Sequence, residues 1–130
     1  MEIYFLEMEK NNNNLKIILN AIVINRIDSI WYINKSEKMM QIPNEMGFIH
    51  VLPVLELSDI SQLLFYDFPI KDVLKTALLS ESEYWVDKAL NQIVFLKLQG
   101  FKEELNSVEH DKRFSQRIRH LAKKIKYQSS

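Results

Sequence analysis

The stretch from Asp111 to Tyr127 reads Asp-Lys-Arg-Phe-Ser-Gln-Arg-Ile-Arg-His-Leu-Ala-Lys-Lys-Ile-Lys-Tyr. Its apolar residues recur at spacings of 4, 3 and 4, the pattern of a helix with one buried stripe: Phe114, Ile118, Leu121 and Ile125. Asp111 is suited to cap the start of this helix, and the lysines of its last turn complement the helix dipole. We therefore predict a terminal helix that begins at Asp111.

A second, shorter stripe lies just upstream of this stretch. Phe101, Leu105 and Val108 follow Gly100, which punctuates the start of the element. We expect this helix and the terminal helix to pack as an antiparallel pair.

A longer helix is predicted before Gly100. Ser80 and Glu83 have the spacing of a capping box, in which each side chain satisfies a free backbone amide of the other residue. The apolar positions that follow cover a wide face: Trp85, Val86, Ala89, Leu90, Ile93, Val94 and Leu98. A face this wide predicts a central helix that is buried from more than one side.

Residues 58–79 are predicted to form two further helical pieces. Ser58 and Asp59 can cap the first piece, and Phe68-Pro69 ends it because proline lacks a backbone donor. Pro69 suits the first turn of the second piece, whose stripe is Ile70, Val73, Leu74, Ala77 and Leu78.

The N-terminal third admits two interpretations. Residues 15–27 are long for one strand, which favours a helix, although several of them are β-branched and favour strands. Residues 30–33 and 38–42 could form a short hairpin, and residues 28–50 are expected to be extended or looped. The predicted fold is mainly α, an irregular stack of about five to six helices with short strands in the N-terminal third, the alternative being α+β.

Length and composition indicate one domain over residues 1–130, mixed or irregular over 1–50 and helical over 58–126. The N-terminus does not resemble a signal peptide, no apolar run is long enough to span a membrane, and the chain has no cysteine. We therefore expect a cytoplasmic protein that does not enter a membrane. The oligomeric state stays open.

The chain is neutral overall, but its charges are unevenly distributed. Residues 1–111 hold all 17 Asp and Glu but only 10 Lys and Arg, a net charge of −7, and residues 112–130 hold the other 7 basic residues. An acidic body suits a basic partner and argues against a domain built for nucleic acid.

The usual catalytic motifs are absent from the sequence. Its two glycines, Gly47 and Gly100, are too far apart to form a phosphate-binding loop, and its three histidines are scattered. We therefore predict no enzymatic activity, no cofactor and no metal.

Two charged segments are candidate binding sites. Acids at the start of the central helix, with neighbouring aromatics, could contact a basic protein: Glu81, Glu83, Tyr84 and Asp87, extended by Tyr66, Asp67 and Asp72. The terminal helix offers basic residues for phosphates: Arg113, Arg117, Arg119, Lys123 and Lys124. A structural interpretation stands beside each: the acids favour the helix dipole, and the terminal helix could pair with the acidic body.

Residues 82–90, Ser-Glu-Tyr-Trp-Val-Asp-Lys-Ala-Leu, and residues 111–124 resemble bacterial immunity proteins of contact-dependent growth inhibition and polymorphic toxin systems. The resemblance covers roughly residues 70–126. It implies a stoichiometric inhibitor that occludes the active or substrate-binding surface of a cognate toxin, often a nuclease with a basic face. It assigns no individual binding residue. The alternatives are a nucleic-acid-associated regulator that uses the terminal helix, or a structural adaptor.

Overall fold

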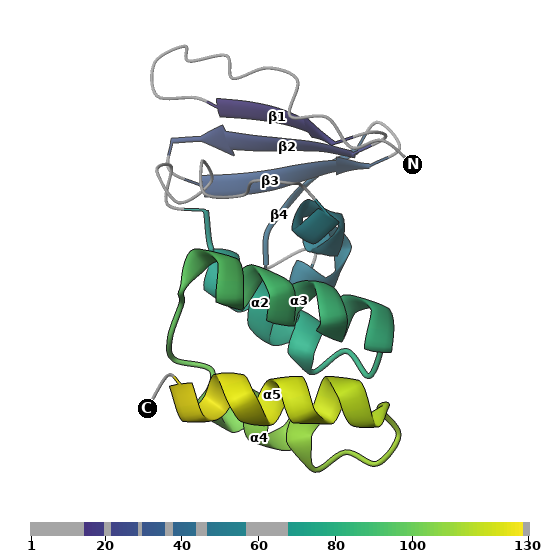
Figure 1. Cartoon of the computed structure of the whole chain (residues 1–130). Helices are drawn as coiled ribbons and strands as arrows, with labels where there is room; N and C mark the ends of the chain where they lie inside the picture. The colour runs from purple at the N-terminus through teal and green to yellow at the C-terminus, as the bar shows by residue number, and fades with distance from the viewer. Residues whose placement is uncertain are drawn as a thin grey trace. The chain divides into compact units, whose positions relative to one another are not determined.

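The computed structural model describes residues 15–19, 22–28, 30–35, 38–43, 47–56 and 68–128. The chain divides into two compact units, Met1–Phe68 and Pro69–Ser130 (Figure 1). The division falls at the Phe68-Pro69 step that was expected to end a helical piece. That piece, predicted from Ser58 onward, lies outside the described residues, and the expectation of a single domain stays a prediction.

The first unit contains a four-stranded antiparallel sheet in which each strand pairs with the next along the chain. The strands are β1 (Leu15–Leu19), β2 (Ile22–Ile27), β3 (Ile30–Lys35) and β4 (Lys38–Gln41). The hairpin predicted over residues 30–42 is confirmed. The helix favoured over residues 15–27 is wrong, because this block holds two short strands rather than one element of 13 residues. The preference of its β-branched residues for strands decides its structure.

Side chains of the sheet alternate in burial, as expected when one face lies on a core. Ile24 and Ile33 are register partners on adjacent strands, and both are buried. Trp31, two residues before Ile33, is on the same face and meets the ring of Phe68 edge-on, with ring centroids 4.8 Å apart. The outer positions, such as Tyr32, are only half-buried.

A 3-10 helix, η1 (Phe48–Glu56), belongs to the same unit and buries four apolar side chains: Val51, Leu52, Val54 and Leu55. Pro53 lies inside it. Residues 28–50 were expected to be extended or looped, and the helix that begins at Phe48 corrects the end of that range.

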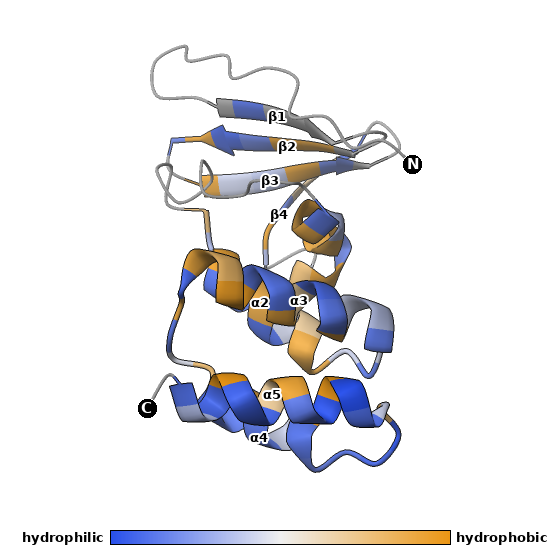
Figure 2. Cartoon of the chain, in the orientation of Figure 1, coloured by the Kyte–Doolittle hydropathy of each residue, from blue (hydrophilic) through white to orange (hydrophobic). Residues whose placement is uncertain are grey.

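The second unit consists of two helical hairpins. The helices are α2 (Ile70–Leu78), α3 (Glu83–Leu96), α4 (Lys102–Glu109) and α5 (Gln116–Gln128). Helix α3 packs on α2 and on α5, and α4 packs on α5 and on α2. Figure 2 shows the hydrophobic residues of α5 on the side that faces α2 and α3. The mainly helical fold with short N-terminal strands is therefore confirmed.

The predicted stripes account for most of this helical core. Every member of the α2 and α4 stripes is buried, as are Phe114, Ile118 and Ile125 from the terminal stretch. The predicted start of the last helix is wrong: α5 begins at Gln116, and the Ser115 hydroxyl accepts a hydrogen bond from the Ile118 amide. Asp111 instead accepts a hydrogen bond from the amide of Arg113 in the preceding turn.

Candidate protein-binding surface

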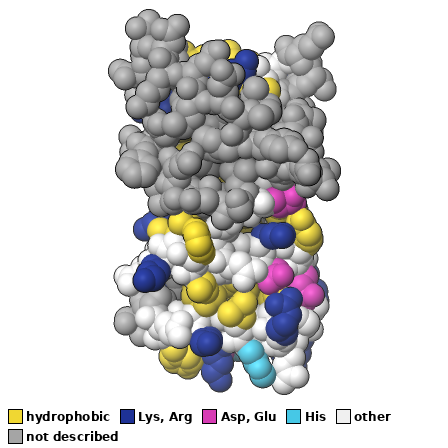
Figure 3. Space-filling view, turned by 45° about the horizontal axis from the view of Figure 1, so that its top comes forward, with side chains coloured by type: hydrophobic (Ala, Val, Ile, Leu, Met, Phe, Trp, Pro, Cys, Tyr) yellow, Lys and Arg dark blue, Asp and Glu magenta, His cyan; other side chains and the backbone are white. Residues whose placement is uncertain are grey.

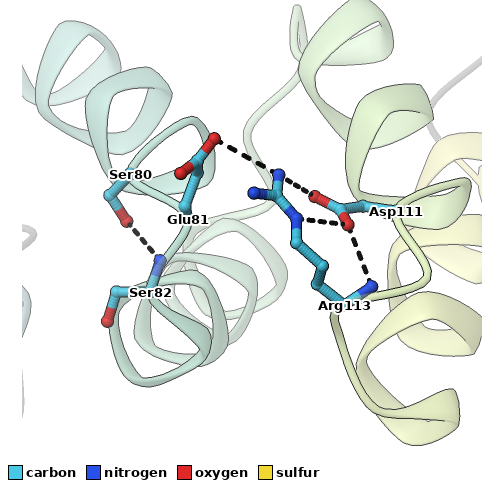
Figure 4. Close-up of polar contacts among 5 residues, drawn as sticks. All are labelled: Ser80, Glu81, Ser82, Asp111 and Arg113. Atoms are coloured by element: carbon cyan, nitrogen blue, oxygen red, sulfur yellow. Dashed lines mark hydrogen bonds and ion pairs between the residues drawn. The ribbon is translucent and has the colours of Figure 1, made fainter.

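The N-cap of helix α3 lies two residues after the predicted one. Ser82 is the N-cap, and its hydroxyl accepts a hydrogen bond from the Trp85 amide at 3.4 Å. Ser80, the predicted cap, donates its hydroxyl to the carbonyl of Ala77. Its hydroxyl oxygen also accepts a hydrogen bond from the Ser82 amide (Figure 4). Glu83 is therefore the first helical residue rather than the third.

Glu81 projects toward the turn between α4 and α5. Its backbone is left-handed, with a φ of 64°, and its carboxylate accepts a hydrogen bond from Nη2 of Arg113 at 3.2 Å (Figure 4). The same guanidinium contacts Asp111 through Nε at 3.0 Å and Nη2 at 2.8 Å. These hydrogen bonds lower the pKa of Asp111 to about 2 and raise the pKa of Arg113.

The other two predicted acids contact the same segment. One carboxylate oxygen of Glu83 accepts a hydrogen bond from the Ser115 amide at 2.6 Å. Asp87 pairs with Arg117, whose Nη1 lies 3.3 Å from Oδ1. Figure 3 shows acidic and basic side chains side by side on this unit. Two of the acids proposed to bind a basic protein, Glu81 and Asp87, therefore contact arginines proposed to bind nucleic acid.

These contacts also fix the relative direction of two helices. Glu83 and Asp87, at the start of α3, meet Ser115 and Arg117, at the start of α5. Val94, near the other end of α3, lines a hollow that α5 also lines near its own end. Helices α3 and α5 therefore run in the same direction, and the hollow lies between their C-terminal ends.

The remaining predicted residues are dispersed. Asp72 is exposed on α2, and Lys123 and Lys124 are exposed on α5. Arg119 is half-buried on α5. Tyr66 and Asp67 lie outside the described residues.

Near the C-terminal end of α5, Lys126 contacts two residues of α4. Its Nζ lies 2.5 Å from Oε1 of Glu109 and donates a hydrogen bond to the side-chain oxygen of Asn106 at 3.0 Å. The hydrogen bond from Lys126 lowers the pKa of Glu109. Both members of the ion pair are largely shielded from solvent, so this basic residue also has an internal role.

The solvent face of α3 carries three exposed apolar side chains, of which only Tyr84 was predicted from the sequence to bind a partner. Tyr84, Val94 and Phe95 are 53%, 51% and 60% exposed. Val94 was predicted to widen the buried face, and its exposure corrects that prediction. Tyr84 and Phe95 are eleven residues apart, close to three helical turns, so they share one face over about 16 Å. We call Tyr84, Lys88, Asn91, Val94 and Phe95 the α3 face.

Tyr84 is held in place on this surface. Its ring meets Trp85 edge-on, with centroids 4.9 Å apart, and Nζ of Lys88 lies 5.5 Å from its centroid. An exposed aromatic side chain held by its neighbours loses little conformational entropy on binding. The spacing of Tyr84, Lys88, Asn91 and Phe95, at i, i+4, i+7 and i+11, was the sequence signal for this face.

One hollow of the second unit, of about 190 Å³, adjoins the α3 face and is lined by residues from the ends of α3 and α5: Ile93, Val94, Lys97, Leu98, Gln99, Ile125 and Gln128. Another hollow, of about 210 Å³, lies at the Glu81–Arg113–Asp111 contacts, with Leu78 and Phe114 among its lining residues.

Comparison with protein-family models, curated proteins and solved structures gave no match. Within the described part of the chain, no helix has the length and apolar character needed to cross a membrane. The same residues contain no group of three His, Asp or Glu side chains placed to hold a metal ion.

Proposed function

We propose that this chain is an immunity protein that binds and neutralises a cognate toxin in the bacterial cytoplasm through the α3 face. The observation that carries the proposal is the exposure of two aromatic side chains, Tyr84 and Phe95, on one face of one helix. Exposed apolar patches with a polar rim are typical of protein-binding sites, and aromatic anchors dominate their binding energy. The resemblance of residues 82–90 to immunity proteins covers the start of this helix.

The net charge of the helical unit does not favour a basic partner. Residues 69–130 carry twelve Lys and Arg against eight Asp and Glu, 12 − 8 = +4, and residues 1–68 carry five against nine, 5 − 9 = −4. The helical unit is therefore basic, and its acids at the start of α3 contact Arg113, Ser115 and Arg117. A basic nuclease, the partner expected from the sequence, would compete with these internal contacts. We therefore base recognition on the apolar surface.

The test begins with affinity capture of the tagged chain from its native cells. The double variant Tyr84→Ala/Phe95→Ala is compared with Tyr127→Ala, which removes an exposed aromatic from α5 rather than α3. Loss of an aromatic anchor costs about 2 kcal/mol or more, so the double variant should bind at least about 30-fold more weakly. The Tyr127 variant should bind as the wild type does.

The captured polypeptide is then expressed alone and with the chain in a bacterial host. The proposal expects growth arrest that co-expression of the wild type relieves and co-expression of the double variant does not. A captured polypeptide that is harmless, or a toxin that the chain does not neutralise, would refute the immunity role. Recovery of nucleic acid that salt removes, with loss of capture on Lys123→Gln/Lys124→Gln, would favour the nucleic-acid-associated regulator.

A further inference from the structure

The hollow between the ends of α3 and α5 continues the α3 face. Val94 belongs to both, so a partner that covers Phe95 would also reach the hollow. The buried side chains Ile93 and Ile125 are among its lining residues, together with Leu98. A volume of about 190 Å³ is sufficient for one branched apolar side chain but not for a drug-sized ligand.

The charge around the hollow is positive. Lys97 is the charged residue among its lining residues, and none of them is acidic. Lys124 is exposed four residues before Gln128, another lining residue, and therefore lies on the same side of α5. Neither lysine forms an ion pair within the described part of the chain. The apolar lining of the hollow and the two lysines beside it would complement a partner segment in which an apolar side chain is flanked by carboxylates.

Lys97 occupies a backbone position that usually favours glycine. It ends α3 in the left-handed conformation, with a φ of 54°. The amides of Lys97 and Leu98 donate to the carbonyls of Val94 and Ile93 at 3.2 and 3.1 Å, closing the helix end. Glycine would close the same end without the steric penalty of a side chain. Lys97 therefore keeps a strained backbone conformation at the edge of the hollow that it lines.

We propose that this hollow receives an apolar side chain from an acidic segment of the partner, with carboxylates of that segment paired to Lys97 and Lys124. The inference rests on the proposed function, because it names the chemistry that the partner presents at the end of the α3 face. The ammonium groups would select the segment by charge, and the apolar lining would hold its central side chain.

The test uses the full chain, labelled with ¹⁵N, and three short peptides. Acetyl-Glu-Leu-Glu-amide should shift the amides of Leu98, Gln99 and Gln128 with a Kd on the order of 1 mM, as expected for so small a ligand. Acetyl-Lys-Leu-Lys-amide and acetyl-Glu-Ser-Glu-amide should bind at least threefold more weakly, because the first reverses the charge and the second removes the apolar side chain.

The decisive variant is Lys97→Gly, with Lys112→Gly as its matched control in the exposed turn before α5. Lys97→Gly should weaken binding of the Glu-Leu-Glu peptide at least threefold while leaving the Tm unchanged or higher. Lys112→Gly should leave that binding unchanged. A lower Tm with retained binding would assign Lys97 to the fold and overturn the proposal. So would equal binding of the Lys-Leu-Lys peptide, or shifts confined to the Glu81 end of α3.

The two proposals fail separately. A peptide that binds in the hollow, from a chain that neutralises no toxin, would leave the acidic-segment site standing without the immunity role. A neutralised toxin, with no peptide binding in the hollow, would keep the immunity role and remove this site.

Discussion

Ile118 offers a direct test of how the helical unit is held together. It is fully buried on α5, the helix that packs on both α3 and α4. Ile118→Ala removes three carbon atoms from the core, a loss of about 2.4 kcal/mol at about 0.8 kcal/mol per buried methylene. The cavity left behind raises the expected cost to about 3–4 kcal/mol. Ile118→Val removes one carbon and should cost about 1 kcal/mol.

The assay is urea denaturation followed by the fluorescence of Trp85. Trp31 and Trp85 are the two tryptophans of the chain and lie in different units, so a Trp31→Phe background makes the signal specific to the helices. In thermal unfolding of a domain of this size, a loss of about 3 kcal/mol in the free energy of unfolding lowers the Tm by about 12 to 24 °C. Lys123→Ala, at an exposed position of the same helix, should change stability by less than about 0.5 kcal/mol. Equal, small effects of all three substitutions would refute the packing of α5 described above.

Three further outcomes test local features of the helical unit. Ser82→Ala removes the N-cap of α3 and should lower the free energy of unfolding by about 1 kcal/mol, whereas Ser107→Ala, on the exposed face of α4, should have little effect in the same urea titration. Arg117→Gln breaks an ion pair whose arginine is 65% exposed, so the loss in that titration should stay below about 0.5 kcal/mol and shrink in 1 M salt. Because the folded pKa of Asp111 lies below its usual value of 3.8, the stability from this carboxylate is present above about pH 4 and lost as pH falls through about 2. An NMR titration of the Asp111 carboxyl carbon should give that pKa, and Arg113→Gln should return it toward 3.8.

The helices could be predicted because their apolar periodicity is visible within a short stretch of sequence. The stripe of Phe101, Leu105 and Val108 needs only the 3.6-residue period, and all three side chains are buried. Residues 15–27 were misassigned because one apolar block with mixed periodicity suits a buried helix or two strands equally. The pairing of Ile24 with Ile33 resolves the ambiguity, and that contact is not visible in a local window.

The candidate site was less predictable than the fold. Glu81 and Arg113 are 32 residues apart, so each was predicted to bind a different partner, whereas the structure brings the two side chains together. The exposure of Val94 could not be inferred from its place in a wide apolar face, because the width of the buried arc depends on which helices pack against α3. The left-handed backbone of Lys97 has no sequence signature, since glycine or asparagine is the usual residue at such a helix end.

The order of the elements has a consequence for how fast the chain folds. Each of the four described strands pairs with its neighbour in the sequence, and in the helical unit α2 packs on α3 and α4 packs on α5. The loops that must close to form these contacts are short, so the entropy lost before each contact forms is small. Helical domains dominated by local contacts fold on the microsecond-to-millisecond scale. The slowest step within the helical unit should be the docking of one hairpin on the other, because the α3–α5 and α2–α4 contacts join the most distant segments.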